Sequence, residues 1–432
     1  MLAWQSSARS YSRRIPVTFA KGAGSFLFDA GGTPYLDFLT GAGASILGHA
    51  HPAVMHAIKT YDAGFLSHLD LITPLEAQFA EQLLPILPFA DRAAVCLHFC
   101  GPSGSDAVEA ALKLARTVTG RDGVWAFSGA YHGDTQGALS VSSNNRLRAL
   151  GLHGARDVTF FPFPLPVPSL RPHRFGAADA AMELTELLLE QALADDHSGI
   201  AKPAAIIIEP VQGEGGVCVA PRTFMTFLRR FCTEHDIVLI CDEIQSGLGR
   251  TGAWFASQHS RIEPDIICVS KGVGGGLPIA FIAYPRRFNT WPPGAHIGTF
   301  RGASLSLACA TAVVKFARDS DLPANVRSVG AHLRGRLEAL QARLPDVTEI
   351  RGLGLFLGVQ FRPDVPDLSN RLGRLLIENR IVAEFVGRNS ATLKLLPPLT
   401  LSFAEADDFC DRFERAVARL SEKEAHPEPV SA

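Results

Sequence analysis

The sequence predicts an α/β protein in which a large domain with a mostly parallel sheet is joined to a smaller α+β domain. Of the 432 residues, 47% are hydrophobic and 19% are charged, which is enough apolar side chain for more than one packed core. From about residue 90 to residue 285, apolar runs of strand length alternate with amphipathic stretches, as in a doubly wound sheet. Beyond residue 300 the pattern changes to long helices with few strands.

The N-terminal segment, residues 1–55, is expected to form part of the small domain. Residues 25–28 and 35–38 alternate around the turn-like DAGGTP, which predicts a small hairpin. The glycine-rich GAGASILGHAHP then leads into a helical pattern. We expect residues 56–305 to form the large domain.

The C-terminal region, residues 306–420, is expected to complete the small domain. Its periodicity predicts two helices, a strand and a final amphipathic helix, over residues 304–317, 325–344, 354–361 and 403–420 in that order. The last residues, 421–432, are polar and contain two prolines, so we expect a disordered tail.

Three buried strands are predicted in the large domain, and each ends in polar residues. The strands are continuous runs rich in Ile and Val, as is typical of strands buried on both faces: 205–208, 237–241 and 266–269. The polar residues that follow them are, in order, Glu209, then Asp242 and Glu243, then Ser270 and Lys271. Because ligands of open α/β sheets bind beyond the carboxyl ends of the strands, we expect these ends to face one crevice.

Composition and charge favour small-molecule chemistry. The formal net charge is −2 and no long run of Lys or Arg occurs, so the electrostatic footprint for nucleic acid or an anionic membrane is missing. The first residues lack the pattern of a signal peptide, and no apolar run approaches the length of a membrane span. We therefore expect a cytoplasmic protein.

The eight cysteines are expected to be reduced core residues. They are scattered, contain no C-x-x-C and mostly lie in apolar stretches. Cys96, His98 and Cys100 raise the alternative of a metal site, but no second ligand pair follows at the spacing of a zinc finger, so no metal is predicted.

Lys271 is a candidate nucleophile because it follows a buried strand and precedes the glycine cluster of VSKGVGGGLP. A solvated surface lysine is the ordinary interpretation of such a residue. The alternative is an amine that burial shifts toward its neutral form and that forms a Schiff base. The residue alone favours neither interpretation.

Asp242 shifts this balance, because a carboxylate at the mouth of the apolar run IVLIC needs a cationic partner. A protonated pyridine nitrogen is such a partner, and the charged ring then acts as an electron sink for a substrate. A salt bridge to an arginine elsewhere in the chain is the structural alternative.

The segment CGPSGSDAVEAALKLAR predicts a loop followed by a helix whose start can hold an anion. Ser103 and Asp106 fit a capping box, and an apolar face follows. Free N–H groups at Gly104 and Ser105 suit a phosphate monoester, although many helices that begin in this way bind nothing.

Tyr131 and His132 lie in the glycine-flanked turn of FSGAYHGDT, where a flat side chain can stack on a cofactor ring. A packed core aromatic is the alternative, and the spacing alone does not decide between the two.

Taken together, these segments resemble the class III (ω-amino acid) aminotransferases of pyridoxal-5′-phosphate (PLP) fold type I. The resemblance covers nearly the whole chain, and its motifs occur in order: YLDFLTGAGASILGHAHP, SGSDAVEAALKLAR, AYHGDT, IIIEPVQGEGGV, LICDEIQSGLGRTG, ICVSKGVGGGLP, GTFRG and KLLPPLTL.

The resemblance implies PLP as the cofactor and assigns residues to it. Lys271 would form the Schiff base and shuttle a proton between the substrate Cα and C4′ of the cofactor, while Asp242 would hold the pyridine nitrogen. The remaining cofactor contacts implied for this chain are Gly104 and Ser105 at the phosphate, Tyr131 on the ring face, Gln245 near the ring hydroxyl and Glu209 in the motif that orders the site.

The resemblance also implies a homodimer with shared active sites, in which Thr299 reaches the phosphate of the neighbouring subunit. Glu214 would be the switch glutamate near the substrate carboxylates. Tyr11 is a further candidate for substrate contact.

Within the family, RSYSRRIPV, FCGPSGSDAVEAALKLAR, TFRG and KLLPPLTL are most similar to diaminobutyrate:2-oxoglutarate 4-aminotransferases. Lys394 stands where many relatives carry an arginine that pairs with the switch glutamate, and lysine is a point charge where arginine is a planar fork. Two further departures are Ala303, where relatives have asparagine, and a proline-rich segment between Phe161 and His173.

The leading hypothesis is a ping-pong transaminase that moves the terminal amine between L-2,4-diaminobutyrate and glutamate/2-oxoglutarate. A transaminase for another ω-amine, such as ornithine, 4-aminobutyrate or lysine, is the nearest alternative. Racemases, decarboxylases and an aminomutase share the fold and the Lys–Asp pair. A non-catalytic paralogue ranks last, because the lysine and the aspartate are both present.

Overall fold

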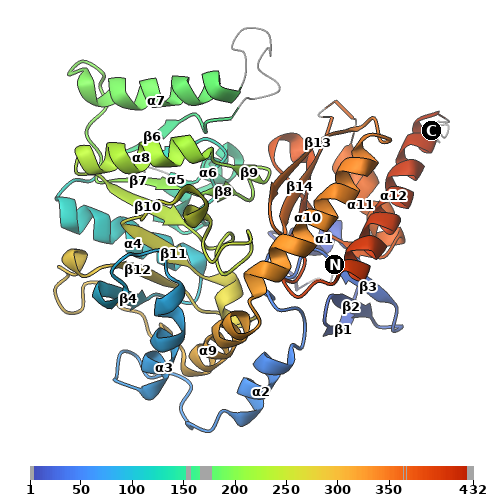
Figure 1. Ribbon diagram of the computed structural model, residues 1–432, viewed down its shortest axis with the longest axis horizontal. Coiled ribbons are helices and arrows are strands. Elements are labelled where there is room, and N and C mark those ends of the chain that lie inside the picture. The colour runs from blue at the N-terminus through green and yellow to red at the C-terminus, as the bar shows by residue number, and fades with distance from the viewer. Residues whose placement is uncertain (1–3, 152–156, 166–177, 363, 366, 426–432) are drawn as a thin grey trace.

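The computed structural model describes residues 4–151, 157–165, 178–362, 364–365 and 367–425. Most of the proline-rich segment between Phe161 and His173 lies outside these residues, as does the end of the tail from 426 onward. Figure 1 shows a large α/β part that contains the main sheet, and beside it a smaller part in which the N-terminal hairpin lies under the C-terminal elements.

The main sheet has seven strands in the order β4-β12-β11-β10-β7-β5-β6. Only β12 runs antiparallel to its neighbours, so the predicted mostly parallel sheet is confirmed. The strands are β4 (Val95–Phe99), β5 (Val124–Phe127), β6 (Val158–Phe161), β7 (Ala205–Ile208), β10 (Val238–Asp242), β11 (Ile266–Val269) and β12 (Phe281–Pro285).

Helices cover both faces of this sheet, because alternate strand residues point to opposite sides. In β7, Ile206 packs in the core that contains Phe231 of α8, whereas Ile207 packs in the core that contains Leu112 of α4. The helices of the large part are α2 (Pro52–Thr60), α3 (Pro74–Leu83), α4 (Gly104–Thr119), α5 (Gln136–Val141), α6 (Asn145–Gly151), α7 (Ala178–Ala194), α8 (Arg222–Glu234) and α9 (Ser304–Asp319).

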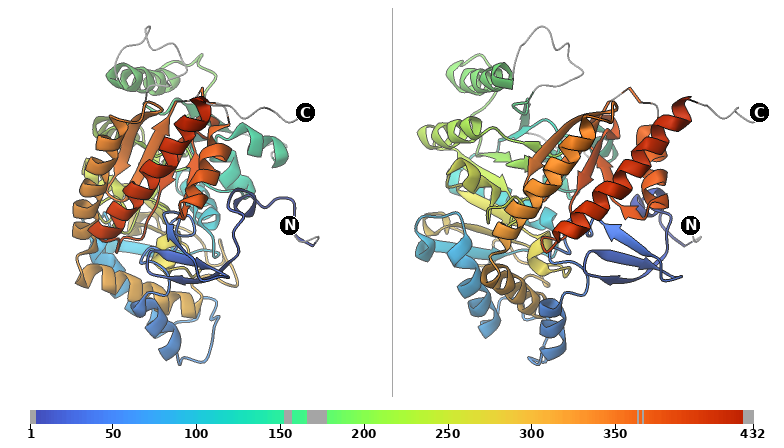
Figure 2. Two further views of the ribbon diagram at one scale, coloured as in Figure 1. Left: turned by 90° about the vertical axis from the view of Figure 1, so that its right-hand side faces the viewer. Right: turned by 45° about the vertical axis from the view of Figure 1, so that its right-hand side comes forward.

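The smaller part contains two four-stranded sheets. One is an antiparallel sheet in the order β13-β14-β17-β16, and Figure 2 shows α10 and α12 lying across it. The other joins the N-terminal hairpin to β15 of the C-terminal region through the parallel pair β3–β15. The elements of the whole smaller part are α1 (Tyr11–Arg14), β1 (Phe19–Ala23), β2 (Phe26–Asp29), β3 (Pro34–Asp37), α10 (Leu322–Gln341), β13 (Val347–Leu353), β14 (Phe356–Phe361), α11 (Leu368–Glu378), β15 (Ile381–Val382), β16 (Glu384–Val386), β17 (Thr392–Leu395) and α12 (Phe403–Ala425).

The predicted hairpin is confirmed as the antiparallel pair β2–β3. The three C-terminal helices differ from their predicted bounds, α9 only in that it ends at Asp319 and not at residue 317. Helix α10 begins at Leu322 because Pro323, which the periodicity left outside the helix, fits the first turn. Helix α12 continues to Ala425, into the tail that was expected to be disordered, since residues 422–425 are all good helix formers.

Helix α9 packs against α2 and α3, beneath the main sheet. A two-residue hairpin pair, β8 (Val211–Gln212) and β9 (Cys218–Val219), lies on the side of the main sheet that faces the smaller part. All eight cysteines are free thiols, and six of them are buried. No helix among the described residues is both long and apolar enough to cross a membrane.

Candidate active site

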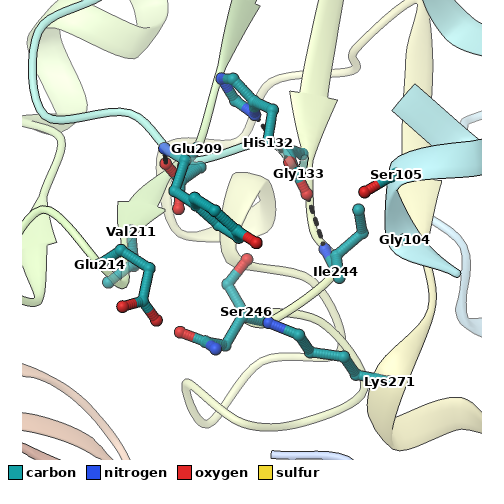
Figure 3. A pocket seen from close by; sticks show the side chains of 13 residues that line it. Gly104, Ser105, His132, Gly133, Glu209, Val211, Glu214, Ile244, Ser246 and Lys271 are labelled. Atoms are coloured by element: carbon teal, nitrogen blue, oxygen red, sulfur yellow. Dashed lines mark hydrogen bonds and ion pairs between the residues drawn. The ribbon is translucent and has the colours of Figure 1, made fainter. Parts of the chain in front are cut away.

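A pocket lies at the carboxyl ends of β7, β10 and β11. Glu209, Asp242 and Lys271 all line it, which confirms the prediction that the three strand ends face one crevice. Figure 3 shows the lining, which comprises Gly104, Ser105, Tyr131, His132, Gly133, Glu209, Val211, Glu214, Asp242, Ile244, Gln245, Ser246 and Lys271.

Lys271 enters the pocket two residues after the end of β11, and its side-chain nitrogen points toward the centre of the pocket (Figure 3). Its backbone has a φ of 49°, in the left-handed region, which is a strained conformation for a residue with a side chain. Burial, helped by the positive charge of Lys394, lowers the pKa of the Lys271 amine. A larger fraction of Lys271 is therefore neutral and nucleophilic than of an exposed lysine.

Asp242 is the last residue of β10, and its side chain is buried. One carboxylate oxygen lies 2.7 Å from Nδ1 of His132, and the other accepts the backbone N–H of Ile244 at 3.1 Å. Burial alone lowers the pKa of His132, but the hydrogen bond and the charge of Asp242 outweigh it and raise that pKa. His132 thus supports a negative charge on Asp242, whose oxygens retain further lone pairs for a cationic partner.

Glu209 connects three segments of the pocket wall. Its side chain accepts the backbone N–H groups of Tyr131 at 2.9 Å and Gly213 at 3.1 Å. Burial raises the pKa of Glu209 to about 7, against the opposing effect of the nearby His132. Glu209 therefore holds the turn that carries Tyr131 next to the loop that carries Glu214.

The first turn of α4 forms the opposite side of the pocket from Glu214 (Figure 3). The predicted capping box is present, since the Asp106 carboxylate accepts the backbone N–H of Ser103 at 3.0 Å. Gly104 is in close contact with Ile244, whose Cγ2 would lie 3.0 Å from an added Cβ. Gly104 and Ser105, the first two residues of the helix, line the pocket, and N–H groups at this position have no acceptor within a helix and suit an anion.

Lys394 lies behind the pocket wall, where it is almost completely buried. Its ammonium forms one ion pair with Glu214, which does line the pocket, and a second with Glu384 at 2.8 Å. The charge of Lys394 overcomes the effect of burial and lowers the pKa of Glu214. Sequence reasoning missed Glu384, because its contact with Lys394 depends on the pairing of β16 with β17.

Besides Lys394, two predicted residues lie outside the pocket lining, Tyr11 and Thr299. Tyr11 of α1 is half-exposed, and burial of its hydroxyl, together with the nearby negative charge of Glu384, raises its pKa. Thr299 is exposed, and its carbonyl oxygen accepts a hydrogen bond from the Ser67 hydroxyl at 2.9 Å. Gln245 does line the pocket, and its side-chain amide donates to the carbonyl of Ala42 at 3.3 Å.

Comparison with known proteins shows the family of the chain. The family model described as aminotransferase class-III matches residues 7–417. The chain is 39% identical over 427 residues to the diaminobutyrate–2-oxoglutarate aminotransferase of Haemophilus influenzae, covering 96% of this chain and 93% of that protein. It is 40% identical over 435 residues to the protein of the same name from Rhizobium meliloti, covering 98% and 92%.

Among solved structures, the fold is similar to a PLP-bound amine transaminase from an uncultivated Pseudomonas species. The TM-score is 0.84 at 28% identity, and the match covers 97% of this chain and 98% of that one. The chain belongs to the class-III aminotransferases. It is an enzyme of PLP fold type I, and its cofactor is PLP.

The residues of the pocket fit this cofactor. An amine of lowered pKa, a buried carboxylate with unused lone pairs and a helix N-terminus lie around one space, and they match the aldehyde, the pyridine nitrogen and the phosphate of PLP. The backbone is also adapted to close packing here, since a Cβ on Gly133 would lie 2.0 Å from the Ser105 hydroxyl oxygen.

Proposed function

We propose that this enzyme transfers the terminal amino group between L-2,4-diaminobutyrate and glutamate/2-oxoglutarate by a ping-pong mechanism. The observation that carries the proposal is the similarity, over nearly the full length, to two proteins that bear this activity in their names. The carboxylate of Glu214 in the pocket wall adds support, because the donor carries a second ammonium group.

Lys271 and Asp242 would be the catalytic residues. When bound, PLP supplies an electron sink that makes a proton on the substrate carbon acidic. Lys271 would hold the cofactor through its amine and then take that proton on Nζ and return it, a task that its lowered pKa favours. Asp242, supported by His132, would keep the proton on the pyridine nitrogen.

The other pocket residues would orient the cofactor. Gly104 and Ser105 would hold the phosphate through the helix N-terminus, and Tyr131 would cover one face of the ring. Gln245 would lie near the ring hydroxyl, and Glu209 would keep Tyr131 in place through its hydrogen bond. Glu214 would contact the substrate, Lys394 would act on it from behind through its ion pair with Glu214, and Tyr11 is a further candidate for substrate contact.

We further propose a cytoplasmic homodimer in which the partner subunit's Thr299 completes the phosphate site. An apolar patch on the chain supports the dimer. It consists of exposed side chains in two adjacent segments: Phe65, Leu66, Leu69, Leu71, Ile72, Ile297 and Phe300. The segments are joined by the Ser67–Thr299 hydrogen bond and the Arg301–Asp70 ion pair, so Thr299 lies within the patch. The free cysteines are typical of a reducing compartment.

The proposal is tested by the absorption spectrum of the PLP-loaded protein before and after L-2,4-diaminobutyrate is added without an acceptor. We expect the visible band of the bound cofactor to bleach to that of the pyridoxamine form, and 2-oxoglutarate to restore it. Lys271→Ala should lack the lysine-linked band, whereas Lys113→Ala, which removes an exposed lysine of α4, should behave as wild type.

The same experiment separates the alternatives. If diaminobutyrate leaves the band unchanged while ornithine, 4-aminobutyrate or lysine bleaches it, the donor is another ω-amine. If product forms in quantity without any keto acid, the enzyme is a racemase, decarboxylase or aminomutase. A protein that shows no band after PLP is added would contradict the assignment of Lys271.

A further inference from the structure

Lys394 is shared by two carboxylates from different parts of the chain. Glu214 comes from the loop after β8, and Glu384 is the first residue of β16. The side chain of Glu214 is 37% exposed, that of Glu384 is 6% exposed, and that of Lys394 is inaccessible. The three charges are therefore layered, with Glu214 facing the pocket and Lys394 and Glu384 behind it.

The sheet register fixes the inner pair. Glu384 and Lys394 are directly opposite one another in the antiparallel pair β16–β17, so their side chains lie on the same face of the sheet. Both strands are buried along their whole length. Removal of the Glu384 charge therefore changes the electrostatics behind Glu214 in a region that water does not screen.

The two carboxylates outnumber the single ammonium, so the cluster carries a net charge of −1. Lys394 is held in its charged form: burial opposes the charge, but Glu214 and Glu384 outweigh it and raise the pKa of its amine. The Tyr11 hydroxyl, with its raised pKa, adds no further charge. Two further cations act on Glu214: Lys271 in the pocket, and Arg14 of α1, which is exposed to solvent.

We propose that Glu384 is a specificity-determining residue that gives the substrate site its negative charge and so favours the diamine over the dicarboxylate. The inference rests on the proposed function and names the group that selects its donor. A lone Glu214–Lys394 pair would be neutral, and Glu384 converts it into a site for a cation.

The two substrates differ at the end remote from the reacting amine. Diaminobutyrate carries an ammonium as well as a carboxylate there, and the negative cluster attracts the ammonium. Glutamate and 2-oxoglutarate carry only a carboxylate at that end, and the cluster repels it unless Glu214 moves away from Lys394. Even then Glu384 partly neutralises Lys394. Through Lys394, Glu384 thus favours the binding of diaminobutyrate and disfavours the binding of glutamate and 2-oxoglutarate.

The test is the isosteric variant Glu384→Gln, loaded with PLP. Half-reactions with diaminobutyrate and with glutamate are followed by cofactor absorbance, and the ratio of their kcat/KM values is compared with wild type. We expect this ratio to fall roughly tenfold, since one buried charge near the substrate is lost. Binding of glutarate, an unreactive dicarboxylate, is measured on the same proteins by calorimetry and should become tighter.

Two variants complete the design. Glu384→Asp keeps the charge and should keep most of the wild-type ratio. Glu378→Gln removes a half-exposed glutamate of α11 that is paired with Arg419, and should change neither ratio nor glutarate affinity. If Glu384→Gln weakens both substrates and glutarate alike, Glu384 is only structural and the inference is wrong. If wild type itself does not react with diaminobutyrate, the proposed function fails and the inference with it.

Discussion

Asp242 and Glu243 are neighbours in the chain but have different roles. The Asp242 side chain faces the pocket and contacts His132, whereas Glu243 points away and accepts the backbone N–H groups of Ala256 and Ser257 at 2.9 and 2.8 Å. Successive side chains at a strand end point to opposite sides, so only one of the two can belong to the site. The sequence predicted that both residues face the crevice, and the hydrogen bonds show that only Asp242 does.

Glu209 leads to a prediction about pH. Its pKa is raised from 4.5 to about 7, chiefly by burial. The raised pKa belongs to the folded state, so the stabilising contribution of protonated Glu209 is complete below about pH 4.5. This contribution is lost as pH rises through about 7. We expect Glu209→Gln to flatten the fall of the melting temperature over this interval, measured by thermal unfolding at fixed PLP concentration. Glu81→Gln, on the surface of α3, is the control and should leave the curve unchanged.

At the scale of elements, helix starts and strand ends follow from local chemistry, whereas their exact extent depends on neighbours. Strands β7 and β11 have the predicted bounds, because both are continuous apolar runs bounded by polar residues. Helix α4 begins at Gly104 behind the capping box. The start of α10 was predicted too late, since periodicity cannot show that a proline lies in the first turn instead of before it.

Ala303 leads to a prediction about stability. It occupies the N-cap of α9 and makes no side-chain cap hydrogen bond. An asparagine there accepts a hydrogen bond from a free N–H of the first turn, so we expect Ala303→Asn to raise the free energy of unfolding by about 1 kcal/mol. Urea unfolding followed by circular dichroism measures the effect. Ala303→Val offers no acceptor, and an equal stability of the two variants would contradict the capping explanation.

At the scale of the molecule, the site needs both parts of the chain. Arg250, buried in the loop after β10, donates to the carbonyl oxygens of Leu355 and Pro397 in the smaller part, at 3.2 Å for Leu355. This contact holds β14 and the segment after β17 against the loop that carries Gln245. The Lys394 cluster is thereby positioned next to the pocket of the large part.

The apolar patch leads to a prediction about assembly. Ile72 is fully exposed in the single chain, so a negative charge there costs little in the monomer but opposes burial against a second copy. We expect Ile72→Glu to shift wild-type dimers toward monomers in sedimentation velocity and to weaken PLP retention, because the partner subunit's Thr299 is lost. Leu187→Glu, at an exposed site on α7, should remain dimeric. A monomeric wild type would contradict the proposed dimer.

The sequence by itself determined the α/β class, the buried strands and the chemistry at their ends. These depend on local patterns: strand ends such as those before Asp242 and Lys271 are marked by an abrupt change from apolar to polar residues. Only the tertiary structure decided which residues lie side by side across long stretches of chain. Glu384 meets Lys394 through the register of β16 with β17, and Glu214 reaches the same ammonium from 180 residues earlier. Register and loop packing depend on the whole core, so no local pattern could show that Lys394 is shared by two carboxylates.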